Sequence, residues 1–430
     1  MTTLITGGTV VDVDGERRAD VVIEGDRIVA VGSNVSVDEP GTTLDATGCF
    51  VAPGFVDLHA HLREPGHEDA ETIETGSRAA ALGGYTAVVA MPNTDPPADA
   101  RSVVEFVRDA GVRAGLCNVY PSGTITVGRA GDQLAPFGEL AGAGVHLFTD
   151  DGAGVQNPQL MRRAMEYALG LDIVLAQHCE VAALSAGAVM HEGSCCSELG
   201  LAGWPALAEE LMVHRDLELS RLTGAPIHLL HLSTAGSVEL VRRAKLEGIR
   251  VTAEVTPHHL SLTDEQLRGY DSWFKVNPPL RTKADVEALI EGVVDGTIDA
   301  IATDHAPHPA ADKEQPLDEA PPGMVGLETA LGVCLPILIA AGMSVTGLVA
   351  ALAGKPATIA GITERHGGPI AAGRPANIVV FDADESWEVV PAKLASRSHN
   401  TPYVGRQLRG VVRHTVLDGV PTVIDGVARQ

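Results

Sequence analysis

Eight short apolar segments recur between residues 55 and 303, and their lengths and flanking turns predict buried strands. They are 55–61, 85–91, 115–120, 145–149, 172–178, 226–231, 249–255 and 299–303. Stretches rich in Ala, Leu, Glu and Arg with helical periodicity lie between most of them, at 71–82, 158–169, 205–222 and 237–246. Repeated strand–helix units predict an α/β fold, a (β/α)8 TIM barrel with insertions, better than an open doubly wound sheet.

The two ends of the chain have a different pattern, in which apolar and polar residues alternate as they do in half-buried strands. The alternating segments are 10–13, 21–24, 27–31, 377–381, 387–390, 411–416 and 422–424. We therefore expect residues 1–52 and 366–430 to form one small, discontinuous antiparallel β-sandwich domain. The barrel is expected to occupy residues 53–365.

The longest apolar run, residues 330–343, is short for a membrane span and contains Gly332 and Pro336, so it predicts a buried helix. The first residues lack the basic and apolar regions of a secretory signal. The six cysteines have no C-x-x-C spacing and are expected to be reduced thiols. We expect a cytoplasmic protein without a membrane role.

The formal net charge of −25 excludes a broad nucleic-acid-binding surface, because phosphates would be repelled. Only six of the 31 basic residues are lysines. An acidic surplus with scarce lysine suggests a high-salt cytoplasm, in which self-repulsion is screened. A high-GC coding bias would explain the preference for arginine but not the full charge.

Residues that can bind metal ions follow most of the predicted strands. The carboxyl ends of barrel strands converge on one mouth, so residues far apart in the sequence can meet there. The strand ends carry His59 and His61, Asn93, Asp150 and Asp151, His178, His231, and Asp304 with His305. A single histidine can belong to the core, and a single aspartate can cap a helix. The whole set favours a metal site.

His59 and His61 lie on one face of the first predicted strand, so their imidazoles can bind one ion. Four imidazoles and two carboxylates suit a pair of divalent ions, zinc first, held by a bridging carboxylate and a bridging water. Such ions would activate that water as hydroxide near neutral pH. Asp304 is placed to take its proton and later deliver it to a departing nitrogen.

The motifs of the chain, taken in order, resemble those of the amidohydrolase superfamily and, within it, the type I (class I) dihydroorotases of bacteria and archaea. They are DLHAHLREPG (57–66), MPNT (91–94), FTDDG (148–152), QHCE (177–180), HLST (231–234), TPHHL (256–260), KVNPPLR (275–281), IATDHAPH (301–308) and PGMVGLET (322–329). The resemblance covers the whole chain. It implies reversible hydrolysis of (S)-dihydroorotate to N-carbamoyl-L-aspartate, a step of pyrimidine biosynthesis.

The resemblance also implies a role for individual residues. It assigns one Zn²⁺ ion to His59, His61 and Asp304, the other to His178 and His231, and the bridge to Asp151. It assigns the substrate carboxylate to Arg63, Asn93 and His308, and the substrate ring to Asn277 and the backbone near Pro322 and Gly323. Relatives differ in whether they keep one or two ions, and both states stay open here.

Many relatives bridge the two ions with a carboxylated lysine instead. The first lysine of this chain is Lys245, beyond the sixth predicted strand, so the composition independently favours an aspartate bridge. Asp150 and Asp151 are both candidates, because strand alternation turns only one of them inward. Arg63 also has an alternative role, an ion pair with a nearby glutamate, Glu64 or Glu68.

Two further features surround the expected site. A Pro-, Ala- and Asp-rich stretch from His308 to Pro322 is typical of a flexible lid, with a merely disordered loop as the alternative. His258 and His259 are expected to support the site rather than to bind metal.

Two alternative functions remain. A hydantoinase or allantoinase would share the metal ions, but Arg63, Asn93 and Asn277 favour a carboxylated pyrimidine ring. A catalytically silent scaffold for an aspartate carbamoyltransferase is the second alternative, and it is disfavoured because every expected metal ligand is kept. Self-association as a homo-oligomer and an aspartate carbamoyltransferase partner both stay open.

Overall fold

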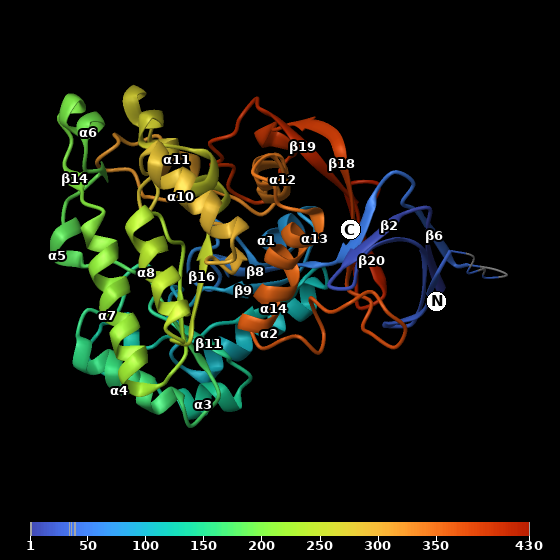
Figure 1. Ribbon diagram of the computed structural model, residues 1–430, viewed down its shortest axis with the longest axis horizontal. Coiled ribbons are helices and arrows are strands. Elements are labelled where there is room, and N and C mark those ends of the chain that lie inside the picture. The colour runs from blue at the N-terminus through green and yellow to red at the C-terminus, as the bar shows by residue number, and fades with distance from the viewer. Residues whose placement is uncertain (1, 34, 36, 38–39, 430) are drawn as a thin grey trace.

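The computed structural model describes residues 2–33, 35, 37 and 40–429 (Figure 1). The expected terminal domain includes positions 1, 34, 36, 38, 39 and 430, which lie outside the described residues. The barrel and a β-rich unit containing both ends of the chain lie side by side, and the blue and red strands share that β-rich unit in Figure 1.

All eight predicted barrel strands are present, and each is parallel to its neighbours. They are β8 (Phe55–Ala60), β9 (Tyr85–Ala90), β10 (Asn118–Pro121), β11 (Leu147–Thr149), β12 (Val174–Gln177), β15 (Ile227–Leu229), β16 (Val251–Val255) and β17 (Ala300–Ile301). They form two sheets, β10-β9-β8 and β11-β12-β15-β16-β17. Parallel bridges from Gly123 to Phe148 and from Ala60 to His305 join the two sheets into a closed barrel. The predicted TIM barrel is confirmed.

Helices surround the barrel, and the longer ones bury apolar side chains. They are α1 (Ile73–Leu82), α2 (Arg101–Ala114), α3 (Phe137–Gly142), α4 (Pro158–Ala168), α5 (Ala182–Ser185), α6 (Ser194–Leu199), α7 (Leu207–Thr223), α8 (Ala235–Leu246), α9 (Pro257–Ser261), α10 (Lys283–Val294), α11 (Ala310–Lys313), α12 (Ala330–Ala340), α13 (Val345–Val349) and α14 (Lys355–Ile359). The shorter elements are β13 (Met190–His191), β14 (Gly203–Trp204), and the helical turns η1 (Val127–Arg129), η2 (Asp264–Gly269), η3 (Ser272–Phe274), η4 (Ala350–Gly354) and η5 (Pro391–Lys393).

The local sequence explains where several of these helices begin. Thr72 and Thr282 each accept a hydrogen bond from the backbone N–H of the third residue of the following helix. The side chain of that third residue accepts the backbone N–H of the cap. Asn157 caps α4, whose first residue is a proline. In α4, the residues Met161, Ala164, Met165 and Ala168 are buried at helical spacing, so this face packs on the barrel.

The expected buried helix at 330–343 is α12, and most of its side chains are buried although Pro336 lies inside it. In the part of the chain that the structure describes, no helix has the length and apolarity needed to cross a bilayer. All six cysteines are buried free thiols, as predicted.

The β-rich unit contains a four-stranded sheet, β5-β4-β1-β6, and a seven-stranded sheet, β21-β20-β19-β18-β7-β2-β3. Its strands are β1 (Thr2–Thr6), β2 (Thr9–Asp12), β3 (Gly15–Arg18), β4 (Asp20–Glu24), β5 (Arg27–Gly32), β6 (Thr42–Asp45), β7 (Phe50–Pro53), β18 (Ile378–Glu388), β19 (Gln407–Leu417), β20 (Val420–Ile424) and β21 (Val427–Ala428). Pairing is antiparallel except between β1 and β6 and between β2 and β7.

Pairing of β7 with β18 joins the two ends of the chain into one sheet. A hydrophobic core that includes Ile5, Val21, Ile378 and Val416 packs in this unit. The unit therefore contains strands from both termini, as the alternating patterns predict. The exact division at 52/53 and 365/366 stays a prediction.

Candidate metal centre

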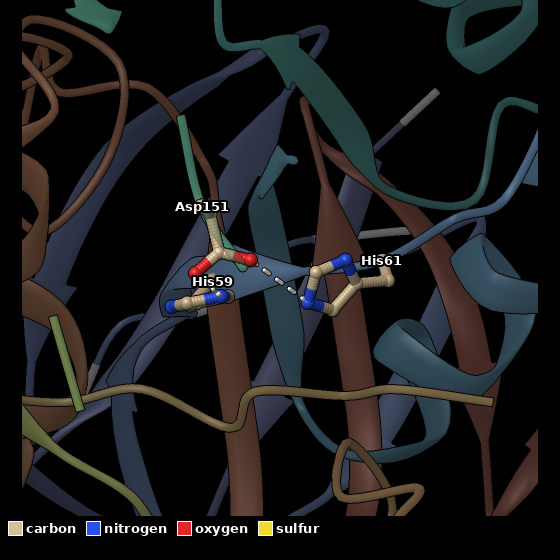
Figure 2. A group of neighbouring side chains, drawn as sticks. All are labelled: His59, His61 and Asp151. Carbon is tan, nitrogen blue, oxygen red and sulfur yellow. Dashed lines mark ion pairs between the residues drawn. The ribbon is translucent and has the colours of Figure 1, made fainter. Parts of the chain in front are cut away.

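A cavity of about 230 Å³ lies among residues that follow the barrel strands. It is lined by His61, Arg63, Asn93, Asp151, Gly152, His178, His231, Asn277, Asp304, Ala306, His308, Pro322 and Gly323. This lining includes every site residue expected from the sequence except His59. The side chain of His59 is fully buried and faces the carboxylate of Asp151 (Figure 2). Because the carboxyl ends of the barrel strands meet at one mouth, the site residues expected from the sequence lie close together in the structure.

His59 and His61 present the same ring nitrogen to the site. The Nδ1 atom of His59 is 2.9 Å from Oε1 of Glu254, and that of His61 is 2.8 Å from Oδ1 of Asn93. Because each Nδ1 faces an oxygen acceptor, it can hold the ring proton when a cation is bound, and Nε2 can then offer its lone pair to that cation. Nε2 of His59 is buried without a hydrogen-bond partner among the described residues. Both rings are therefore prepared to bind a cation.

Asp151 faces His59 and His61 (Figure 2), and its carboxylate also lies near His178 and His231. Its Oδ1 is 3.4 Å from Nε2 of His59, 3.4 Å from Nδ1 of His178 and 3.3 Å from Nε2 of His231. Its Oδ2 is 3.4 Å from Nε2 of His61. Asp151 belongs to two triads whose ligand atoms lie within 4.8 Å of one another, one with His59 and His61 and one with His178 and His231. Asp151 is therefore the residue that these two triads share.

Burial alone would raise the pKa of Asp151, but the charge of His59 and hydrogen bonds from His178 and His231 hold it well below its usual range. Asp150 has a different role. Its Oδ1 accepts the backbone N–H groups of Ile125 (2.8 Å) and Thr126 (3.0 Å). Of the two candidates for the bridge, Asp151 faces the histidines and Asp150 anchors the neighbouring loop.

Asp304 completes the first group. Its Oδ1 lies 3.2 Å from Nε2 of His61 and 3.5 Å from Nε2 of His59. Burial works to raise the pKa of Asp304, but the charge of His59 and the hydrogen bond with His61 outweigh it and lower the pKa. Asp304 has a positive φ of 45°, and so do His231 (31°) and Arg63 (61°). Left-handed backbone at non-glycine residues is strained and concentrates at functional sites.

Glu180 is a site residue that the sequence reasoning missed. Its Oε2 is 2.9 Å from Nε2 of His178 and 3.3 Å from Nδ2 of Asn277, and its Oε1 accepts the hydroxyl of Ser185. Burial lowers the pKa of His178, but Asp151 and Glu180 outweigh it and raise the pKa to about 9. Its position two residues after His178 is the signal that could have identified it.

The donor set fits divalent cations. Four imidazoles and two ionised carboxylates surround one small region, and imidazole with carboxylate is the ligand combination of zinc and similar borderline ions. Nε2 of the fully buried His59 has no hydrogen-bond partner among the described residues. The site is therefore built to hold metal ions.

Arg63 supplies the positive charge on the other side of the cavity. Its Nε donates to the carbonyl of Pro307 (3.1 Å), and its Nη2 is 3.3 Å from Nε2 of His308. Glu64 and Glu68 instead accept backbone N–H groups, and Arg63 forms no ion pair within the described residues. The guanidinium thus lines the cavity without a rim glutamate as its partner among the described residues.

Asn277 offers an unused acceptor. Its Oδ1 is buried without a hydrogen-bond partner in the described structure, while its amide donates to Glu180. A buried carbonyl oxygen in this state is costly unless a ligand supplies an N–H group. His308 is a second fixed group, because its Nε2 lies 2.9 Å from the carbonyl of Pro322.

The stretch from His308 to Pro322 is held at several points. On α11, Nζ of Lys313 donates to the carbonyls of Pro321 (3.0 Å) and Lys275 (3.3 Å). Burial lowers the pKa of Lys313 to about 7. Asn400 ties the two ends of the stretch together: its Nδ2 donates to Ala306 (3.0 Å) and Gly323 (3.1 Å), and its Oδ1 accepts N–H of His308 (3.1 Å). Closure as a lid stays a prediction.

His258 and His259 lie outside the two ligand triads that share Asp151. His259 is held by Thr256 (2.8 Å) and by the carbonyl of Pro278 (3.0 Å). Its contacts are those of a residue that supports the loop carrying Asn277.

Comparison with known proteins gives one consistent family. The model of a family described as "Dihydro-orotase-like" matches residues 48–237. A dihydroorotase of Streptomyces coelicolor is 51% identical over 427 residues, covering 99% of each chain. A dihydroorotase of Pelotomaculum thermopropionicum is 50% identical and covers 100% of both chains. A third, from Mycobacterium tuberculosis, is 48% identical over 97% of each chain.

Among solved structures, an L-hydantoinase of Arthrobacter aurescens superposes with a TM-score of 0.87 at 25% identity, covering 100% of this chain and 97% of that one. A dihydropyrimidinase of Brevibacillus agri gives a TM-score of 0.85 at 22% identity, covering 100% and 96%. These likenesses confirm the barrel with its additional β-rich unit.

Proposed function

The chain belongs to the dihydroorotase family, and we propose that it is the enzyme that reversibly hydrolyses (S)-dihydroorotate to N-carbamoyl-L-aspartate in pyrimidine biosynthesis. Three relatives named dihydroorotase, 48–51% identical over 97% or more of the chain, support this. The single observation that carries it is one cavity that joins the carboxylate-bridged histidines to the guanidinium of Arg63. Such a cavity suits a cyclic amide that bears a carboxylate.

We assign one ion to His59, His61 and Asp304, a second to His178 and His231, and the bridge to Asp151. Zinc is the proposed metal, with one or two ions per subunit. When bound, the ions supply a water acidic enough to attack at neutral pH and polarise the ring carbonyl. The shared position of Asp151 in both triads supports its assignment as the bridge.

Asp304 is the proposed general acid and base. Its carboxylate is held ionised by His59 and His61, so it can accept the proton of the attacking water. It then delivers that proton to the ring nitrogen as the amide bond breaks. Its strained backbone fixes the carboxylate at the cavity wall before substrate arrives.

The other cavity residues orient the ring. Arg63 binds the substrate carboxylate through two parallel hydrogen bonds, assisted by Asn93 and His308. The unpartnered Oδ1 of Asn277 accepts a ring N–H group, and the backbone at Pro322 and Gly323 contacts the ring. This set holds the scissile bond against the histidine cluster.

A hydantoinase activity is the second candidate, because the solved structures with this fold include hydantoinases. Arg63 distinguishes the two, since a hydantoin or dihydrouracil ring brings no carboxylate to it. We would measure kcat/KM of the zinc-loaded protein on dihydroorotate, 5,6-dihydrouracil and hydantoin. We expect dihydroorotate to be preferred by at least about 100-fold, because the guanidinium is left without its anion by the other two rings. An equal or reversed preference would replace the proposal by the hydantoinase assignment.

Three broader expectations stay proposals. They are the domain ranges (1–52 with 366–430, and 53–365), a cytoplasmic location, and association into a homo-oligomer or with an aspartate carbamoyltransferase. Limited proteolysis tests the first, cell fractionation the second, and light scattering with co-purification the third.

A further inference from the structure

A polar network lies inside the barrel behind the metal centre. Glu254 on β16 is fully buried, and each of its carboxylate oxygens contacts one imidazole. Oε1 is 2.9 Å from Nδ1 of His59, and Oε2 is 3.0 Å from Nε2 of His228 on β15. His228 is also fully buried, and its Nδ1 is 2.8 Å from Oγ1 of Thr252. None of these three supporting residues lines the substrate cavity.

Burying this polar network inside the barrel costs free energy. A carboxylate without water is costly unless its oxygens receive hydrogen bonds, and two flanking imidazoles supply them here. Apolar side chains would fill the same layer at no such cost, as Leu58, Ala176 and Leu230 do nearby. Packing does not explain these buried polar groups, but the contact of Glu254 with His59 does.

Glu254 selects which nitrogen of His59 carries the proton. With the proton on Nδ1, the ring donates to Glu254 and leaves Nε2 bare toward Asp151. With the proton on Nε2, the ring would lose its bond to Glu254 and point N–H at the place of the cation. The buried anion therefore strongly favours the first form.

His59 and His61 are supported differently. His61 donates to the neutral amide oxygen of Asn93, whereas His59 donates to a carboxylate. An anionic acceptor makes the imidazole a stronger electron donor to a metal than a neutral acceptor does. The two histidines of one triad are thus unequal, and His59 is the stronger ligand.

We propose that Glu254 is a positioning residue of the metal centre that fixes the ring of His59 and strengthens it as a ligand, and that His228 in turn fixes Glu254. The inference rests on the proposed function only in taking His59 as a metal ligand. Glu254 acts through His59 and touches neither substrate nor reacting atoms. Its loss therefore weakens metal binding before it affects substrate binding.

The test uses the full-length protein and Zn²⁺ alone, with zinc affinity measured by competition against a chelator. We expect Glu254→Ala to weaken zinc binding about 10- to 100-fold, as loss of such supporting carboxylates does. Glu254→Gln keeps the shape and an acceptor for His59, so its loss should be smaller, about 3- to 10-fold. It also guards against an alanine variant that fails to fold.

Glu328→Gln is the control, because Glu328 is a half-buried glutamate that bonds only to the backbone of Ala395 and Ser396. Its zinc affinity should stay within about twofold of wild type. A second readout is the proton NMR signal of the His59 Nδ1–H group. It should be protected from exchange in wild type and shift in Glu254→Gln, which a purely structural role would not cause.

The outcomes separate this inference from the proposed function. At saturating zinc, KM for dihydroorotate should be unchanged in Glu254→Gln while kcat falls. Wild-type zinc affinity in both Glu254 variants would overturn the inference even if dihydroorotate is hydrolysed. Weakened affinity in a protein that fails to hydrolyse dihydroorotate would uphold the inference and remove the proposed function.

Discussion

Replacing Arg63 with methionine should remove the anion-binding charge of the cavity while keeping most of the side-chain volume. The guanidinium lies at the cavity wall and has two hydrogen-bonding contacts with described residues, the carbonyl of Pro307 and the ring of His308. Because it has no carboxylate partner among the described residues, we expect its charge to act on the ligand. The substitution should therefore act on substrate recognition more than on stability.

The magnitude follows from the half-buried position of Arg63. Truncating one partner of a buried, hydrogen-bonded ion pair costs about 2–5 kcal/mol. A half-buried pair belongs at the lower end, about 2–3 kcal/mol, which is about a 30- to 150-fold fall in kcat/KM. The unfolding free energy should fall by only about 1 kcal/mol, for the lost hydrogen bond to Pro307.

The assay compares dihydroorotate with 5,6-dihydrouracil, the same ring without its carboxylate, in wild type, Arg63→Met and Arg63→Lys. Arg63→Lys should recover part of the lost kcat/KM, because it keeps the charge and loses the planar fork. Turnover of dihydrouracil should change by less than about threefold in either variant. Equal losses on both substrates would refute the assignment of Arg63 to the carboxylate.

Asp304→Ala should lower kcat by at least about 100-fold, the range for a lost general acid and base. Metal analysis should still find an ion at the triad of His178, His231 and Asp151. Near-wild-type turnover would remove Asp304 from its role. Asp151→Asn should lose most bound zinc, whereas Asp150→Asn should keep it and lower the melting temperature, because Asp150 holds backbone N–H groups; the reverse result would exchange the two roles. The pKa of Lys313 falls from its ordinary 10.5 to about 7 on folding. Between those values the unfolded chain binds more protons, so stability should rise with pH by up to about 1.4 kcal/mol per unit relative to Lys313→Met. Parallel denaturation curves of the two proteins from pH 7 to 10 would contradict this.

The sequence was sufficient to predict the barrel because each strand–helix unit carries its own periodicity. The limits of the strands were less predictable. β17 spans only Ala300–Ile301, and β10 begins at Asn118 rather than at 115, because barrel closure decides where pairing starts. Segments 377–381 and 387–390 both contribute to one strand, β18 (Ile378–Glu388), whose pairing with β19 shifts register between Asp382 and Ser386. The acidic residues between Asp382 and Ser386 are typical of a loop, so the sequence pattern did not predict a continuous strand.

The site residues likewise fall into those that the sequence predicts and those that it does not. Residues that follow the strands could be predicted, because parallel strands deliver them to one mouth. Asp150 and Asp151 could not be separated, since both follow the same strand and only the loop at Ile125 fixes their orientations. Glu254 was missed because its partner His59 lies 195 positions away. Contacts of that kind depend on the closed barrel and leave no local pattern.

Asn400 has a consequence for how the protein matures during synthesis. All six proposed metal ligands precede residue 305, but the amide that joins Ala306 to Gly323 is contributed by a segment translated about a hundred residues later. A nascent chain still attached to the ribosome before that point carries the ligands without the clamp on its substrate loop. Competence for turnover is therefore acquired late, after the closing stretch of the polypeptide has folded back onto the barrel mouth.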